Sequence, residues 1–230
     1  MKKLTLLLAL TMVITGMTSG IASAISYSVT YGGDLGDGGY TSAVTTNVET
    51  FDGDQLLWNW NPAGNYNIVS GSASGSYAAP AYFNGTSNVS DTTNYMSVPR
   101  AGSSLSSLTN NVTATNLGGD YSYFGIWWGS MDTYNTLTFL DNNNSVAPIT
   151  GAMLAAPLAN GDQFTPGTNR YVNFYFQDGS FDSFMMTSTQ FAFEADNIAI
   201  ATPEPSTMLL LGAGMLSLLV FGRRRMNNKA

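Results

Sequence analysis

Residues 25–202 contain no long run with the 3.6-residue periodicity of an amphipathic helix. Short segments rich in Thr, Tyr, Phe and Val instead alternate with clusters of Gly, Asn and Asp. Aromatic and β-branched residues favour strands, whereas Gly, Asn and Asp favour turns. Short strands joined by such turns are typical of a jelly-roll sandwich. The sequence therefore predicts an all-β fold, specifically an antiparallel β-sandwich of the jelly-roll kind.

Alternation of apolar and polar residues locates most of the expected strands. The candidates are residues 25–31, 43–51, 56–60, 133–141, 145–150, 170–176, 184–187 and 191–200. Residues 121–129 are apolar at both odd-numbered and even-numbered positions, so we expect a central strand that is buried on both faces. Residues 70–94 are small and polar, which predicts a loop-rich or weakly ordered stretch.

The last expected strand contains a break in its alternation. Phe193 has an odd number, whereas Ile198 and Ile200 have even numbers. A strict period of two would place them on opposite faces of the sheet. One extra residue in a β-bulge near Glu194 and Asp196 would return them to one face. The sequence therefore predicts a bulge that carries two acids.

The N-terminus has the features of a secretory signal peptide. Lys2 and Lys3 form a basic region, residues 4–14 form an apolar region, and Ala22-Ser23-Ala24 is an A-x-A cleavage site. We expect residues 1–24 to be removed during export, which leaves an extracytoplasmic domain over residues 25–202.

The C-terminus combines three dissimilar features in a fixed order. Pro203-Glu204-Pro205-Ser206 is followed by the apolar residues 207–222 and by three arginines, 223–225. At ~1.5 Å per residue the apolar run spans roughly 24 Å as a helix, less than the ~30 Å hydrocarbon core of a bilayer. Arginines beside an apolar span favour the cytoplasmic side. We expect a short transmembrane helix that acts as a temporary stop.

This tail resembles the PEP-CTERM sorting signal of Gram-negative bacteria, with Pro203, Glu204, Pro205 and Ser206 as its motif. The resemblance covers residues 203–230. It implies that an exosortase, a membrane-embedded enzyme, cuts near the motif. The implied route is an inner-membrane precursor that passes to the cell surface or the extracellular matrix of a biofilm.

The resemblance predicts the cellular location of the protein but not its biochemical activity, because the same tail is carried by many unrelated domains, including some ice-binding proteins. Known ice-binding faces are flat and repetitive, and residues 25–202 contain no internal repeat. We therefore do not expect ice binding.

Charge and composition exclude several classes of function. Residues 25–202 hold 14 of the 15 acids but only Arg100 and Arg170 as bases, a net charge of about −12. Such a surface repels nucleic acid. The chain has no His and no Cys, so Ser-His-Asp triads, Cys-His pairs and zinc sites with nitrogen or sulfur ligands are excluded. Two carboxylates could still hydrolyse glycosides, but most acids lie in turns with Gly or Asn, and we expect no enzyme.

A structural Ca²⁺ site is one expectation for the acids. The ending Asp196-Asn197-Ile198 is similar to the last strand of jelly rolls that resemble carbohydrate-binding modules. In those folds an acid before an early strand and the Asp of the last strand share a Ca²⁺ ion. The resemblance implies that Glu49, Asp52 or Asp54 would pair with Asp196, and oxygen ligands of this kind suit Ca²⁺.

Glycan binding is the alternative function that the sequence leaves open. Trp58 and Trp60 could provide flat apolar surfaces on which sugar rings stack, with Asn and Asp supplying hydrogen bonds. The main expectation is a non-enzymatic protein of the surface or biofilm matrix. The alternative is a module that binds exopolysaccharide, with or without the Ca²⁺ ion.

Overall fold

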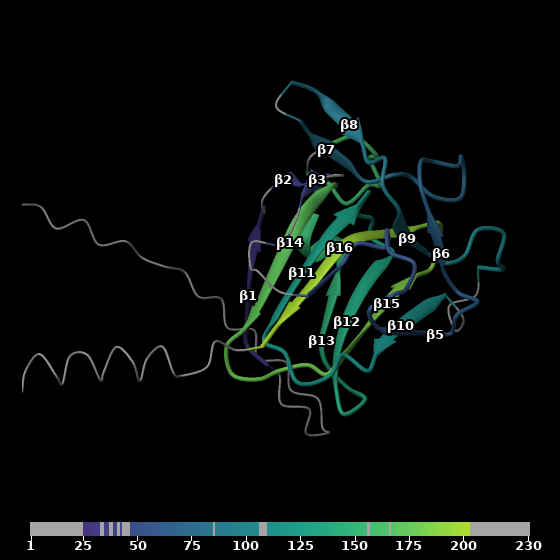
Figure 1. The fold of residues 1–230 in the computed structure, drawn as a ribbon. Helices are drawn as coiled ribbons and strands as arrows, with labels where there is room; N and C mark the ends of the chain where they lie inside the picture. The colour runs from purple at the N-terminus through teal and green to yellow at the C-terminus, as the bar shows by residue number, and fades with distance from the viewer. Residues whose placement is uncertain are drawn as a thin grey trace, which may run out of the picture.

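Two antiparallel β-sheets make up most of the structure (Figure 1). The computed structural model describes residues 25–202 except 33–34, 37–38, 41, 43–46, 85, 106–109, 156 and 166. The predicted signal peptide, sorting motif and tail helix lie outside the described residues. The all-β, antiparallel fold class is confirmed.

The larger sheet has seven strands, with the order β1-β14-β11-β16-β9-β6 and with β4 also paired to β16. Its strands are β1 (Tyr27–Tyr31), β4 (Asn47–Glu49), β6 (Asn67–Val69), β9 (Tyr95–Val98), β11 (Tyr123–Gly129), β14 (Arg170–Phe176) and β16 (Phe193–Ala201).

The smaller sheet has five strands in the order β13-β12-β15-β10-β5. Its strands are β5 (Asn59–Asn61), β10 (Asn111–Thr115), β12 (Asn135–Asp141), β13 (Asn144–Thr150) and β15 (Ser183–Ser188). From β10 to β16 the chain passes repeatedly from one sheet to the other, as in a jelly roll.

Three small elements complete the fold: the hairpin of β2 (Leu35–Gly36) and β3 (Gly39–Tyr40), the hairpin of β7 (Ala81–Phe83) and β8 (Asn88–Ser90), and the helix α1 (Gly151–Ala155). The β7–β8 hairpin projects beyond the end of the larger sheet (Figure 1).

The hydrophobic core lies between the sheets and is built largely from aromatic rings. Phe139 of β12 is fully buried, and its ring lies 5.0 Å from that of Phe124 on β11 and 5.4 Å from that of Phe174 on β14. The core members of β11 and β14 have even numbers, as their alternation requires. Strands far apart in sequence thus meet through one aromatic cluster.

All seven residues of β11 are buried, as predicted for a central strand. One face of the strand meets the core, and the other is covered by residues that precede β9. The ring of Tyr82 packs edge-on against Trp127 at 5.7 Å. Residues 70–94 are rich in loops, as one of the two expectations had it, but the expectation of weak order is wrong, because Ala78, Ala81 and Asp91 are buried against the sheet.

The predicted bulge in β16 is confirmed. The pairing of β11 with β16 shifts between Gly125 and Trp127, and Asn197 adopts a positive φ of 47°. Phe193 and Ile198 consequently both reach the core. Glu194 and Asp196 occupy the alternate positions, so they lie on the outer face beneath residues 77–91.

The two ends of the described domain lie at the same end of the larger sheet. Ser28 pairs with Tyr175, Tyr175 with Tyr123, and Tyr123 with Ala201 at the end of β16. Glu194 pairs with Gly129 at the other end of the same strands. At ~3.3 Å per residue the two ends of β11 are roughly 20 Å apart.

Candidate functional site

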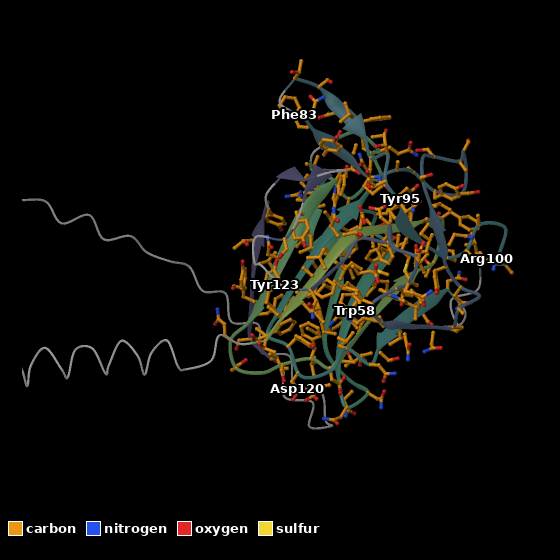
Figure 2. All side chains as sticks on the ribbon, in the orientation of Figure 1. Trp58, Phe83, Tyr95, Arg100, Asp120 and Tyr123 are labelled. Atoms are coloured by element: carbon orange, nitrogen blue, oxygen red, sulfur yellow. The ribbon has the colours of Figure 1, made fainter. Side chains whose placement is uncertain are left out.

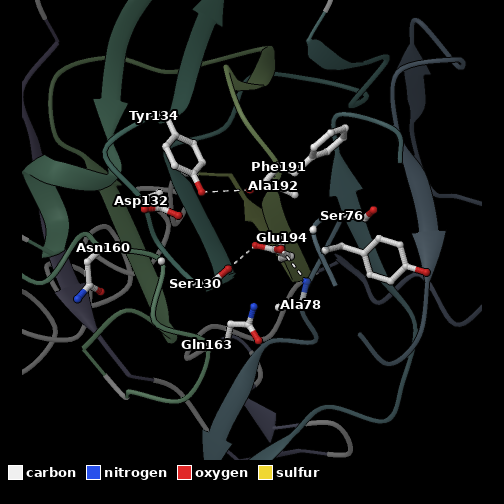
Figure 3. A pocket seen from close by; sticks show the side chains of 13 residues that line it. Ser76, Ala78, Ser130, Asp132, Tyr134, Asn160, Gln163, Phe191, Ala192 and Glu194 are labelled. Atoms are coloured by element: carbon white, nitrogen blue, oxygen red, sulfur yellow. Dashed lines mark hydrogen bonds between the residues drawn. The ribbon is translucent and has the colours of Figure 1, made fainter. Parts of the chain in front are cut away.

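A polar cavity of about 340 Å³ lies at the Glu194 end of the larger sheet (Figure 3). The turn after β11, the loop before β7, the loop after α1 and the start of β16 form its walls. The cavity is lined by Gly75, Ser76, Tyr77, Ala78, Ser130, Asp132, Tyr134, Asn160, Gly161, Gln163, Phe191, Ala192 and Glu194.

Glu194 is 1 % exposed at the base of this cavity. The Ser130 hydroxyl donates a hydrogen bond of 2.5 Å to Oε2, and the Ala78 amide donates one of 2.9 Å to Oε1 (Figure 3). Burial raises the pKa of Glu194 to about 8, because desolvation outweighs the stabilising effect of the two hydrogen bonds. The carboxyl group is therefore mostly protonated and neutral at pH 7.

A second acid, Asp132, and Tyr134 stand on the opposite wall of the cavity. Burial raises the pKa of Asp132, and a hydrogen bond with Tyr134 partly offsets the effect. The Phe191 carbonyl, 3.1 Å from the Tyr134 hydroxyl, is a second acceptor for the same hydroxyl proton (Figure 3). Gly161 makes room for Asp132, since a Cβ there would lie 2.3 Å from Oδ2. The cavity thus combines two acids with aromatic and amide groups.

The aromatic residues predicted to stack on sugars lie in the core instead. Trp58 is 7 % exposed and Trp60 is 4 % exposed. The Trp60 ring packs edge-on against Phe184 at 5.5 Å and also contacts Phe51. The prediction that Trp58 and Trp60 present faces to a glycan is therefore wrong, because protein side chains already cover those faces.

The predicted metal ligands have different environments, and Asp54 is exposed. Glu49 is buried, and its two oxygens accept hydrogen bonds from the amides of Phe51 and Leu57. It therefore braces the loop after β4. Asp52 is exposed and accepts a hydrogen bond of 2.8 Å from the Asn94 amide. Its charge raises the pKa of Asp196, so the structure brings these two acids near each other.

Asp91 is an acid near Asp196 that sequence reasoning missed. It is 2 % exposed and follows β8 on the segment that crosses the outer face of the larger sheet. Its charge is the largest influence on the pKa of Asp196 after burial, and both effects raise it. The sequence Ser90-Asp91-Thr92 has no feature that distinguishes it from an ordinary turn.

Within the part of the chain that the structure describes, no helix is both long and apolar enough to cross a bilayer. The predicted span at 207–222 lies outside that part.

Comparison with known proteins identifies the C-terminal region. A model of the PEP-CTERM protein-sorting motif matches residues 201–225, which include the motif residues Pro203, Glu204, Pro205 and Ser206. Neither curated proteins nor solved structures give a match. The match confirms the resemblance found in the sequence and implies export, a membrane-anchored precursor and processing by an exosortase. The C-terminal region therefore carries the PEP-CTERM protein-sorting motif, which supports sorting of the protein to the surface by an exosortase.

Proposed function

We propose that this protein is a non-enzymatic component of the cell surface or biofilm matrix. The sorting motif at residues 201–225 is the observation that carries the proposal. An acidic surface without Lys between residues 25 and 202 keeps the domain hydrated and soluble outside the cell. The absence of His and Cys and the engagement of both Glu194 oxygens support a role without catalysis.

The position of the cavity supports display at a surface. The chain leaves β16 at Ala201 toward the sorting motif, and Glu194 lies at the other end of the same strand. A precursor held through its tail would therefore present the cavity at the end of the domain away from the point of attachment.

Replacing Glu204 with Ala is expected to leave the full-length precursor in the inner membrane. The change alters the motif but not the apolar run that stops translocation. Fractionation and immunoblotting would measure the membrane-bound and surface-exposed pools. Asn227→Ala, a change in the same tail beyond the arginines, is the matched control. Equal release of the Glu204→Ala variant and the wild type would show that the motif is not read.

A second candidate function is recognition of exopolysaccharide in the Glu194 cavity. Tyr77, Tyr134 and Phe191 are partly exposed at its walls, while Asn160 and Gln163 supply exposed amides. Sugar sites commonly combine an apolar aromatic surface with a few polar groups. This combination favours the cavity over Trp58 and Trp60 as the place where a neutral glycan would bind.

The Gln163→Ala variant is expected to lose retention on a column of the host's own exopolysaccharide. We expect a several-fold reduction, since a lost hydrogen bond in a binding site typically costs about 0.5–1.5 kcal/mol. Gln55→Ala changes an exposed glutamine outside the cavity and should bind as the wild type does. Equal retention of both variants, or none by the wild type, would exclude glycan binding in this cavity.

A further inference from the structure

Two buried carboxyl groups, those of Asp91 and Asp196, lie within hydrogen-bonding reach of each other beneath the outer face of the larger sheet. Asp196 is fully buried on β16, where it pairs with Trp127 of β11. Asp91 is 2 % exposed on the segment that covers this face, and its amide donates a hydrogen bond of 2.8 Å to the Pro80 carbonyl. The backbone on both sides therefore fixes the two acids in place.

Each acid uses one of its two carboxylate oxygens in a hydrogen bond, and the other oxygen has no donor in the described part of the chain. Asp196 Oδ1 accepts a hydrogen bond of 2.7 Å from the Asn197 amide. Asp91 Oδ1 accepts hydrogen bonds from the amide and the hydroxyl of Thr93, at 2.8 and 2.6 Å. No donor among the residues that the structure describes gives a hydrogen bond to Asp91 Oδ2 or to Asp196 Oδ2, although both atoms are buried.

This arrangement is costly unless Asp196 holds a proton or a cation lies between the two carboxylates. Burying an ionised carboxylate without a partner carries a large desolvation penalty, and two like charges repel each other. The domain has only two bases, and the Arg170 guanidinium is already engaged by the Gly167 carbonyl and the Tyr31 ring. A bound cation would offset both the burial and the repulsion.

We propose that Asp91 Oδ2 and Asp196 Oδ2 bind a divalent cation of the Ca²⁺ class beneath the outer face of the larger sheet. The site goes beyond the sorting role and replaces the expected ligand set, because Glu49 uses both of its oxygens on backbone amides. Asp52 lies at the edge of the site, where its Oδ1 accepts a hydrogen bond from Asn94.

The ligand chemistry selects a hard cation. The protein ligands are carboxylate oxygens, and the chain has no His or Cys to attract zinc or copper. Among the described residues, no group of three or more acids is arranged to hold a metal. Backbone carbonyls and water must therefore complete the shell, which Ca²⁺ tolerates because its six to eight oxygen ligands adopt variable geometry.

Thermal unfolding of the full chain in mild detergent tests the site. The protein is first treated with EDTA and dialysed, and CaCl₂ is then added at constant ionic strength. A Ca²⁺ concentration 100-fold above Kd is expected to raise Tm by about 5–10 °C for a domain of this size. Calorimetric titration should show saturable binding. No shift and no binding heat would overturn the proposal and leave the acids sharing a proton.

The variants Asp91→Asn and Asp196→Asn test whether the Ca²⁺-induced rise in Tm arises from binding at these two acids. Each removes one charge while keeping the side-chain shape, so each should fold without added metal and lose the Ca²⁺-induced rise in Tm. Asp120→Asn, an exposed acid at the other end of the domain (Figure 2), should respond as the wild type does. A full response in either of the first two variants would place the ion elsewhere and contradict the proposal.

Discussion

The Trp60→Ala variant is expected to lose about 3–5 kcal/mol of unfolding free energy. Trp60 is 4 % exposed and packs against Phe51, Trp58 and Phe184 between the two sheets. Removing its ring would leave a cavity that these neighbours fill only in part. Denaturant unfolding followed by circular dichroism measures the change.

The matched control for this prediction is Phe83→Ala. Phe83 is 44 % exposed on β7, so its removal should change the unfolding free energy by no more than about 0.5 kcal/mol. If Trp60→Ala kept its stability and lost retention on polysaccharide, Trp60 would be a binding surface, and its assignment to the core would be wrong.

The Glu194→Gln variant is expected to become more stable than the wild type as the pH rises from 5 to 8. The folded protein holds the Glu194 proton up to a pKa of about 8, whereas the unfolded chain releases it near 4.5. The folded state therefore binds more protons in this range, so the stability of the wild type falls with rising pH. The loss is on the order of 4 kcal/mol.

Hydrogen bonding explains why glutamine should be tolerated at position 194. Its amide oxygen can accept from the Ala78 amide, and its NH₂ group can donate to the Ser130 hydroxyl oxygen. Unfolding in urea at pH 5 and pH 8, with EDTA present, measures the difference between variant and wild type. An unchanged difference at the two pH values would contradict the assignment of a raised pKa to Glu194.

Glu49→Gln is the matched comparison. Both Glu49 oxygens accept hydrogen bonds from backbone amides, so the NH₂ group of glutamine would face a donor. This variant should lose about 1–3 kcal/mol of unfolding free energy. The same chemical change is therefore expected to stabilise the protein at one buried glutamate and destabilise it at the other when the pH is 8.

The fold class could be predicted because the long strands alternate clearly. The prediction of a strand at 170–176 matches β14, and the parity change between Phe193 and Ile198 correctly predicted the bulge. β6 and β9 were missed because they have only three and four residues, too few for a periodic pattern. β10 was missed because only two of its five residues, Val112 and Ala114, are apolar, and they lie in a largely polar segment.

The site was harder to predict because its residues meet through long-range contacts. Ala78 and Glu194 are hydrogen-bonded although 116 residues separate them in the chain. The small, polar residues at 70–94 predicted a loosely packed segment. Small side chains such as that of Ala78 nevertheless pack closely against the outer face of the larger sheet. Tryptophan content likewise did not reveal whether Trp58 and Trp60 face solvent or the core. In contrast, the sorting motif is contiguous, so sequence alone was sufficient to find it.

The most direct test of the central claim is the intact mass of the protein recovered from cells with and without their exosortase. Surface material from the exosortase-positive strain should lack both the signal peptide and the residues beyond a cut near Pro203-Glu204-Pro205. The deletion strain should hold a membrane-bound form that keeps its C-terminal arginines. The same C-terminus and the same distribution in both strains would contradict exosortase-dependent sorting.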